Sequence, residues 1–178
     1  AGPAGDGFDT ADYLLTAVDA NGVPYPDDVQ QGTTSAADFD WVWGQHAPML
    51  LPNGNLLVFD NGVNRNFGSA PLFSRAVEYE IDEDAMTVRQ VWSYGAERGV
   101  DYYSSIISDV DYLPRTGNRL VAPGFISDGA SPPTAYVTEV DPGTGEVIFD
   151  ARIDMKNINS TGSGWGQFDI VYRAERMR

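Results

Sequence analysis

Several kinds of residue are scarce in this sequence, and each shortage excludes a class of protein or site. Cysteine is absent from the 178 residues, so disulfides, thiol nucleophiles and thiolate metal sites are excluded. Lysine and arginine number 11 against 26 aspartates and glutamates, and the resulting net charge of −15 argues against a nucleic-acid partner. No apolar run approaches the roughly 20 residues of a membrane-spanning helix, so no membrane span is expected.

Helical periodicity is also missing, and the pattern in its place is that of an all-β protein. Short runs rich in Val, Ile, Tyr and Phe alternate with clusters of Gly, Pro, Asn and Asp. Residues 1–37 are predicted to form a flexible N-terminal segment and a long loop, because Gly, Pro, Asp and Thr dominate them. Residues 38–178 are predicted to carry the β-structure.

An internal repeat organises this β-region. The stretch LPNGNLLV at 51–58 is echoed by LPRTGNRLV at 113–121, and the first leucines of the copies lie 62 positions apart. In each copy Gly-Asn marks a turn between two strands, and a second hairpin follows after a loop. Besides the strand that emerges from each turn, the predicted strands are 47–51, 76–82 and 86–94 in the first copy, and 106–113, 134–141 and 146–153 in the second.

Four consecutive antiparallel strands in each repeat are typical of a β-propeller blade. A β-sandwich also has many short strands, but it does not have two matched four-stranded modules in series. Residues 168–173, FDIVYR, are predicted to form one further strand, the first of another blade. Two blades and a strand cannot close a ring and would leave apolar faces open. The remaining blades are therefore expected from upstream sequence or from another chain.

The only histidine, His46, follows the aromatic run WVWGQ and directly precedes the first strand of the first repeat. Such a strand end is a common place for site residues near the central channel of a propeller. With an ordinary pKa of about 6.5, imidazole is a competent nucleophile near neutral pH. The alternative is a purely structural role, in which the lone His46 only caps an element or packs against its neighbours.

Several blocks, in their order along the chain, resemble the bacterial aryl-sulfate sulfotransferases. They are LTAVDANGV (15–23), GQH (44–46), LPNGNLLVFDNG (51–62), SRAVEY (74–79), VWSYGAERG (91–99), DYYS (101–104) and YRA (172–174). The resemblance implies a six-bladed propeller in the periplasm or outside the cell. It also implies transfer of a sulfuryl group from a phenolic sulfate ester to a phenol, with no nucleotide sulfate donor or other cofactor.

The resemblance further implies that the GQH histidine, which is His46 here, forms a transient sulfohistidine. The other catalytic residues of the family, further histidines and an arginine, lie on earlier blades and would precede residue 1. Activity is therefore expected to need upstream blades.

Two more residues are predicted to bind substrate. Arg98, in the GAERG segment, is a candidate for holding the sulfuryl oxygens, which need cationic or N–H donors. The alternative is that Arg98 has a structural role and forms a salt bridge with Glu97 or with a neighbouring loop. Tyr103 stands ahead of the second repeat, in a position analogous to His46, and is predicted to line an aromatic pocket for the phenol. The alternative is that Tyr103 is a buried residue of the hydrophobic core.

The sequence thus favours a segment of an aryl-sulfate sulfotransferase-like enzyme, with a phenolic sulfate donor and a phenol acceptor as partners. The alternatives are a non-catalytic propeller module used for binding or as a surface scaffold, and a genuine relative that has lost activity. Two aspartate pairs, Asp38 with Asp40 and Asp109 with Asp111, have oxygen ligands for a cation. Solvated carboxylates explain them more simply, so no metal site is predicted.

Overall fold

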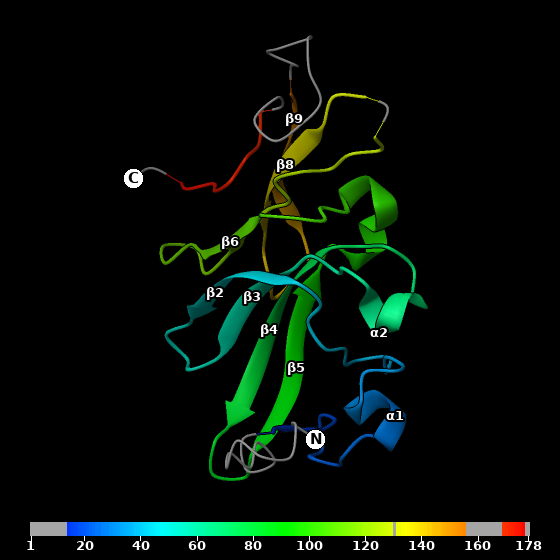
Figure 1. Cartoon of the computed structure of the whole chain (residues 1–178). Helices are drawn as coiled ribbons and strands as arrows, with labels where there is room; N and C mark the ends of the chain where they lie inside the picture. Colours follow the sequence, from blue (N-terminus) through cyan, green and yellow to red (C-terminus); the bar gives the residue numbers. More distant parts are fainter. Residues whose placement is uncertain (1–13, 130, 156–168, 177–178) are drawn as a thin grey trace, which may run out of the picture.

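The computed structural model describes residues 14–129, 131–155 and 169–176, which fold into two β-sheets that follow one another along the chain (Figure 1). The first sheet has the strand order β1-β5-β4-β3-β2, and the second has the order β6-β7-β8-β9. Apart from the parallel pairing of β1 with β5, neighbouring strands are antiparallel. The described residues are therefore mostly β-sheet, in agreement with the all-β prediction.

Strands β2 to β9 lie within a few residues of the predicted ones, whereas β1 falls in the region 1–37 that was predicted to be a flexible segment and a loop. The first sheet contains β1 (Thr16–Ala17), β2 (Gln45–Leu50), β3 (Leu56–Asp60), β4 (Arg75–Asp82) and β5 (Thr87–Tyr94). The second contains β6 (Asp109–Tyr112), β7 (Arg119–Ala122), β8 (Thr134–Val140) and β9 (Val147–Asp154). The helical turns are α1 (Asp27–Gln30), α2 (Arg65–Gly68) and η2 (Ala96–Tyr102). No helix in the described ranges is long and apolar enough to cross a membrane.

The two copies of the repeat form corresponding hairpins, with one more residue in the turn of the second copy. In the first copy the Leu51 N–H donates to the Asn55 carbonyl at 2.8 Å, and in the second the Leu113 N–H donates to the Asn118 carbonyl at 2.9 Å. Each turn contains a glycine with a left-handed φ, of 89° in the first copy and 79° in the second, which a residue with a Cβ adopts only with strain. The repeat therefore predicts two matched four-stranded modules, β2–β5 and β6–β9, and the structure confirms them.

The further strand predicted at 168–173 is not formed over its described part, residues 169–173, and Phe168 lies outside the described residues. A strand requires a partner, and no second strand of that module lies beside this segment among the described residues. Instead, the Val171 N–H donates to the Gly124 carbonyl at 3.1 Å, and the Ala174 N–H donates to the Asp109 carboxylate at 3.2 Å. The segment 169–176, red in Figure 1, is thus tied to the second sheet by isolated hydrogen bonds.

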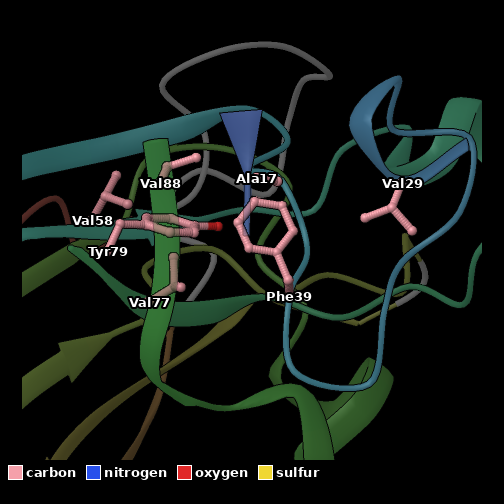
Figure 2. Packing of buried hydrophobic residues seen from close by; sticks show 7 residues of the cluster. All are labelled: Ala17, Val29, Phe39, Val58, Val77, Tyr79 and Val88. Atoms are coloured by element: carbon pink, nitrogen blue, oxygen red, sulfur yellow. The ribbon is translucent and has the colours of Figure 1, made fainter. Parts of the chain in front are cut away.

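One face of the first sheet is partly covered by residues 14–43. Figure 2 shows the cluster, in which Ala17, Val29 and Phe39 pack with sheet residues Val58, Val77, Tyr79 and Val88. Phe39 is fully buried and makes an edge-on contact with Trp41, with 5.0 Å between ring centroids. Residues 14–37 therefore contribute β1, α1 and part of a hydrophobic core.

The opposite face of the first sheet packs against the second module, because side chains of the two sheets alternate toward a shared core. This second core consists of Leu51, Leu57, Phe59, Ala76, Tyr102, Val110 and Val121. Burial of such apolar surface is the main favourable term that holds the two modules together.

A buried ion pair also joins the sheets. Glu78 on β4 accepts hydrogen bonds from Asn55 Nδ2 in its own module and from Arg119 Nη2 on β7 of the next, both at 2.7 Å. Both charged side chains are more than nine-tenths buried. Removing either partner would leave an uncompensated buried charge.

The same arrangement recurs one repeat later. Glu139 on β8 accepts hydrogen bonds from Asn118 Nδ2 at 2.7 Å and from Arg176 Nη1 at 2.5 Å. Glu139 and Asn118 correspond to Glu78 and Asn55, because Glu139 pairs with Leu120 as Glu78 pairs with Leu57, and Asn118 closes its turn as Asn55 does. The C-terminal segment therefore also pairs an arginine with a buried glutamate, but the Arg176 side chain is 57% exposed, whereas that of Arg119 is 8% exposed.

Acidification is expected to weaken the ion pair between the sheets. Burial raises the pKa of Glu78, but hydrogen bonds from Arg119, Asn55 and Asn53 outweigh burial and hold the pKa below its ordinary value. A carboxylate with a lowered folded-state pKa stabilises the fold above its unfolded-state pKa, and this contribution is lost as the pH falls through the folded-state value.

We expect the wild type to exceed Glu78→Gln in unfolding free energy by roughly 2 kcal/mol near pH 6. The difference should shrink as the pH is lowered to about 3. Urea unfolding at several pH values measures this difference, and a value independent of pH would contradict the prediction.

Candidate functional site

His46 is the second residue of β2, which together with β3 contacts β6 of the second sheet. Its partner across the sheet is Phe59 on β3, but the pairing shifts between His46 and Met49. Ala47 has a left-handed φ of 50°, which is a strained conformation for a residue with a Cβ. This bulge redirects the strand at His46, where the two modules meet.

A cavity of about 280 Å³ opens beside His46. It is lined by β2, by the start of β6 and by the C-terminal segment, namely by His46, Ala47, Pro48, Met49, Ser108, Asp109, Val110, Asp111, Tyr172 and Arg173. The volume is close to the lower end of the range for small-molecule sites, about 300 Å³. The cavity thus joins His46 to a tyrosine and an arginine to which the sequence assigned no role in a site.

The cavity lining carries charges of both signs. Burial raises the pKa of Asp109 above its ordinary value, although the N–H of Ala174, which donates to this carboxylate, acts in the opposite direction. Arg173 is exposed and ion-paired with Glu175 at 2.7 Å. An imidazole, carboxyl groups and a guanidinium therefore surround one small space, and these are the groups that nucleophilic and acid–base chemistry uses.

His46 is held by a fully buried asparagine. Its Nδ1 lies 2.6 Å from Oδ1 of Asn61, the residue that follows β3. Asn61 Nδ2 in turn donates to the backbone carbonyls of Ser104 at 2.6 Å and Ile107 at 2.7 Å. Both carbonyls belong to the loop that leads into β6, so the second module fixes the side chain that holds the histidine of the first.

Buried serines support this loop. The Ser74 hydroxyl donates to the Asn61 carbonyl at 2.8 Å and accepts the Ser104 N–H at 2.9 Å. The Ser108 hydroxyl lies 3.0 Å from the Ser104 hydroxyl, so the serines form one connected network. Sequence reasoning assigned no role to Asn61 or to these serines. Asn-Gly at 61–62 indicates only a turn, and the family blocks that contain Ser74 and Ser104 do not show which of their residues support a site.

Arg98 does not line the cavity at His46. It lies on η2, and its guanidinium stacks over the rings of Tyr102 and Tyr136 at 4.3 and 4.5 Å. Its Nη1 is 3.1 Å from Asp150 on β9. Burial opposes the charge of Arg98, but the hydrogen bond to Asp150 and further polar contacts raise its pKa above the ordinary value. Arg98 thus connects η2 to the second sheet through Asp150, not Glu97, and its substrate-binding role stays a prediction.

Tyr103 also does not line the cavity, and it is half-buried. Its neighbour Tyr102 is the fully buried residue of the pair, and the Tyr102 hydroxyl donates to Thr138 at 2.9 Å. Tyr102 therefore belongs to the core between the sheets, whereas the role of Tyr103 in phenol binding stays a prediction.

The aspartates considered as cation ligands mostly have protein partners. Asp40 is paired with Arg65, and Asp38 accepts a hydrogen bond from the Tyr25 hydroxyl at 2.6 Å. Within the ranges that the structure describes, no group of three or more His, Cys, Asp or Glu residues is placed to hold a metal ion.

Gly124 allows the C-terminal segment to reach the cavity. A Cβ on Gly124 would lie 1.8 Å from the Val171 carbonyl oxygen. We expect Gly124→Ala to displace the segment that carries Tyr172 and Arg173, at a cost of about 1–3 kcal/mol. Hydrogen exchange at the Val171 amide, which donates to Gly124, should become roughly 5- to 150-fold faster.

Gly117→Ala is the control for this prediction. Gly117 has a left-handed φ of 79°, but a Cβ there would meet no atom within 4 Å. This variant strains a turn without displacing the C-terminal segment, so Val171 exchange should stay unchanged. Equal exchange at Val171 in both variants would contradict the role given to Gly124.

Comparison with known proteins agrees with the resemblance seen in the sequence. The family Arylsulfotransferase (ASST) matches residues 3–165. An arylsulfate sulfotransferase AssT of Escherichia coli O6:H1 (strain CFT073) is 39% identical over 157 residues, and one of Lelliottia amnigena is 36% identical over 157 residues. Each alignment covers 85% of this chain but only 26% of the relative, so the chain spans about a quarter of their length. The match over most of its residues establishes that the chain belongs to the arylsulfotransferase family.

Proposed function

We propose that this chain is the part of an aryl-sulfate sulfotransferase that carries the nucleophile. The observation that supports this best is His46, the only histidine of a chain in this family, held by buried Asn61 at a cavity between the modules. The donor is a phenolic sulfate ester and the acceptor is a phenol. The proposed location is the periplasm or the extracellular space, as the family resemblance implies.

The proposed reaction has two half-reactions. First, an imidazole nitrogen of His46 attacks sulfur, the N–S bond forms, the S–O bond to the aryl oxygen of the donor breaks, and phenolate leaves with the electron pair. Next, the acceptor phenol gives up its proton and its oxygen attacks sulfur, while the N–S bond breaks and its electron pair returns to the imidazole. The proton lost by the acceptor balances the one that the phenolate takes up. A covalent intermediate replaces one difficult step by two easier ones.

We also propose that the two modules are blades of a six-bladed propeller whose other blades lie upstream or on another chain. An apolar cavity of about 270 Å³ lies on the face of the first sheet that points away from the second module. Pro48, Leu56 and Val58 line this cavity. The residues at the same positions of the second repeat are Val110, Arg119 and Val121, and these pack the second module against the first. A preceding module of the same kind fits this face.

The test uses the full-length protein that contains these residues. A chromogenic aryl sulfate such as 4-nitrophenyl sulfate is supplied with and without phenol as the acceptor. We expect release of nitrophenolate that depends on the acceptor, with the parallel double-reciprocal lines of a ping-pong mechanism. Intersecting lines would overturn the covalent intermediate, and release that ignores the acceptor would overturn the transferase assignment.

A further inference from the structure

We propose that Asn61 is a positioning residue that fixes His46 as the Nδ1–H tautomer, so that Nε2 is the nitrogen that attacks sulfur. The identification of Nε2 as the nucleophile rests on the proposed function. The tautomer assignment does not, because it follows from hydrogen bonds alone. A neutral imidazole carries one proton, and the partner of one ring nitrogen decides which nitrogen remains free to react.

The orientation of the Asn61 amide follows from its two neighbours in the second module. The amide nitrogen has two hydrogens, and the carbonyls of Ser104 and Ile107 accept them at 2.6 and 2.7 Å. If the amide were flipped, its oxygen would face two carbonyl oxygens at hydrogen-bond distance with no hydrogen between them. Asn61 is 0% exposed, so water cannot satisfy those groups. Oδ1 therefore points to His46.

The amide oxygen can only accept, so the nitrogen 2.6 Å from it must donate. This assigns the proton to Nδ1 of His46 and leaves the lone pair on Nε2. Nε2 makes no hydrogen bond with any described residue, and His46 lines the cavity. The free lone pair thus belongs to a side chain at the cavity wall, as a nucleophile requires.

The same hydrogen bond becomes stronger during reaction. When Nε2 bonds to sulfur, its lone pair is shared and the ring, which still holds the Nδ1 proton, becomes positively charged. A charged donor forms a hydrogen bond roughly twice as strong as a neutral one. Asn61 therefore stabilises the transition state more than the free enzyme, which is the condition for raising kcat.

Asparagine suits this place better than aspartate does. A carboxylate would face the carbonyls of Ser104 and Ile107 with no hydrogens to donate, and its charge would be fully buried. The proton on Nδ1 is thus specified by a neutral group that the second module holds in place. This makes the nucleophile of the first module dependent on the loop at 104–107 of the second.

The first test needs no substitution at Asn61. The full-length protein is labelled with 15N-histidine, and the His46 signals are assigned as those that disappear in His46→Ala. We expect a protonated Nδ1 and an unprotonated Nε2 at a pH where the ring is neutral. The Nε2–H tautomer, or an even mixture of the two, would overturn the proposal.

The second test removes Asn61, the hydrogen-bond acceptor of His46 Nδ1. In Asn61→Ala we expect the His46 signals to move toward the Nε2–H tautomer or a mixture, with a roughly 10- to 100-fold fall in kcat and little change in KM for the donor. Asn53→Ala is the control, because Asn53 is an exposed turn asparagine of the same module whose side chain donates to Glu78 at 3.3 Å, accepts the Asn55 N–H at 3.1 Å and makes no hydrogen bond with His46. An unchanged tautomer or unchanged kcat in Asn61→Ala would overturn the proposal.

The two proposals fail separately. A wild-type protein with the Nδ1–H tautomer but no transfer activity would support the tautomer assignment and overturn the proposed function. An active protein whose His46 carries its proton on Nε2 would leave the function standing and overturn the role of Asn61. If Asn61→Ala does not fold, the tautomer of the wild type still decides the proposal.

Discussion

Replacing His46 with alanine is expected to lower acceptor-dependent sulfuryl transfer by the full-length protein by at least about 10³-fold. The physical reason is that His46 is the only side chain with a nitrogen lone pair among the described residues that line the cavity. Asp109, Asp111 and Tyr172 offer oxygens, and Arg173 is a cation without a lone pair to give. The measurement is the initial rate of nitrophenolate release with and without phenol.

Two further measurements separate a lost nucleophile from a lost fold. Incubation of the wild type with the donor alone should add one SO₃ group to the peptide that contains His46, and His46→Ala should show no such adduct. Free imidazole added to His46→Gly should restore part of the rate, because it can enter the space left by the ring. His46→Ala with a rate close to that of the wild type would show that the intermediate forms elsewhere or not at all.

The modules were predictable from sequence because their signals are local. Gly54 and Gly117 sit in turns whose left-handed φ angles favour glycine, and each turn is followed by a short apolar run of strand-forming residues. The link between Glu78 and Arg119 was not predictable. It joins residues 41 positions apart, and only the packing of one sheet on the other brings them together.

One residue of the candidate site, His46, could be predicted from the sequence, but the residues that surround it could not. His46 stood out because it is the only histidine and lies in GQH. Asn61 did not stand out, because its contact with His46 depends on a bulge in β2 and on carbonyls of another module. Tyr102 and Tyr103 show a related limit. They lie where η2 ends, so neither the helical nor the strand period decides which of two neighbouring side chains enters the core.

Replacing Asp60 with alanine is expected to lower the local stability of the first sheet by about 3–5 kcal/mol. Asp60 is fully buried at the end of β3, and its Oδ2 accepts hydrogen bonds from Arg65 Nη2 at 2.8 Å and Arg75 Nε at 3.0 Å. Its Oδ1 accepts the N–H groups of Trp43 at 2.7 Å and Gly62 at 3.0 Å. The variant would leave two buried guanidinium groups with half of their counter-charge and two buried N–H groups without an acceptor.

Native-state hydrogen exchange in the full-length protein measures this loss at the amides of β3 and β4. The matched control is Glu80→Ala, which removes a carboxylate of the same sheet from its pair with Arg89 at 2.6 Å. In that pair Glu80 is exposed and Arg89 is only half-buried, so its loss should cost less than about 1 kcal/mol. Equal costs in the two variants would mean that the buried pairs around Asp60 contribute no more than a surface pair does.

Asp60 also links the stability of the first sheet to the position of Asn61, and so to the proposed chemistry. It precedes Asn61 and holds the backbone on both sides of the site, at Trp43 before the GQH block and at Gly62 after Asn61. Asp60→Ala should therefore loosen the Asn61 amide and bring the His46 signals toward a tautomer mixture, although Asp60 makes no hydrogen bond with the ring. Glu80→Ala should leave those signals unchanged. If Asp60→Ala lowers stability but the Nδ1–H tautomer persists, the two carbonyls at 104 and 107 are sufficient to orient Asn61.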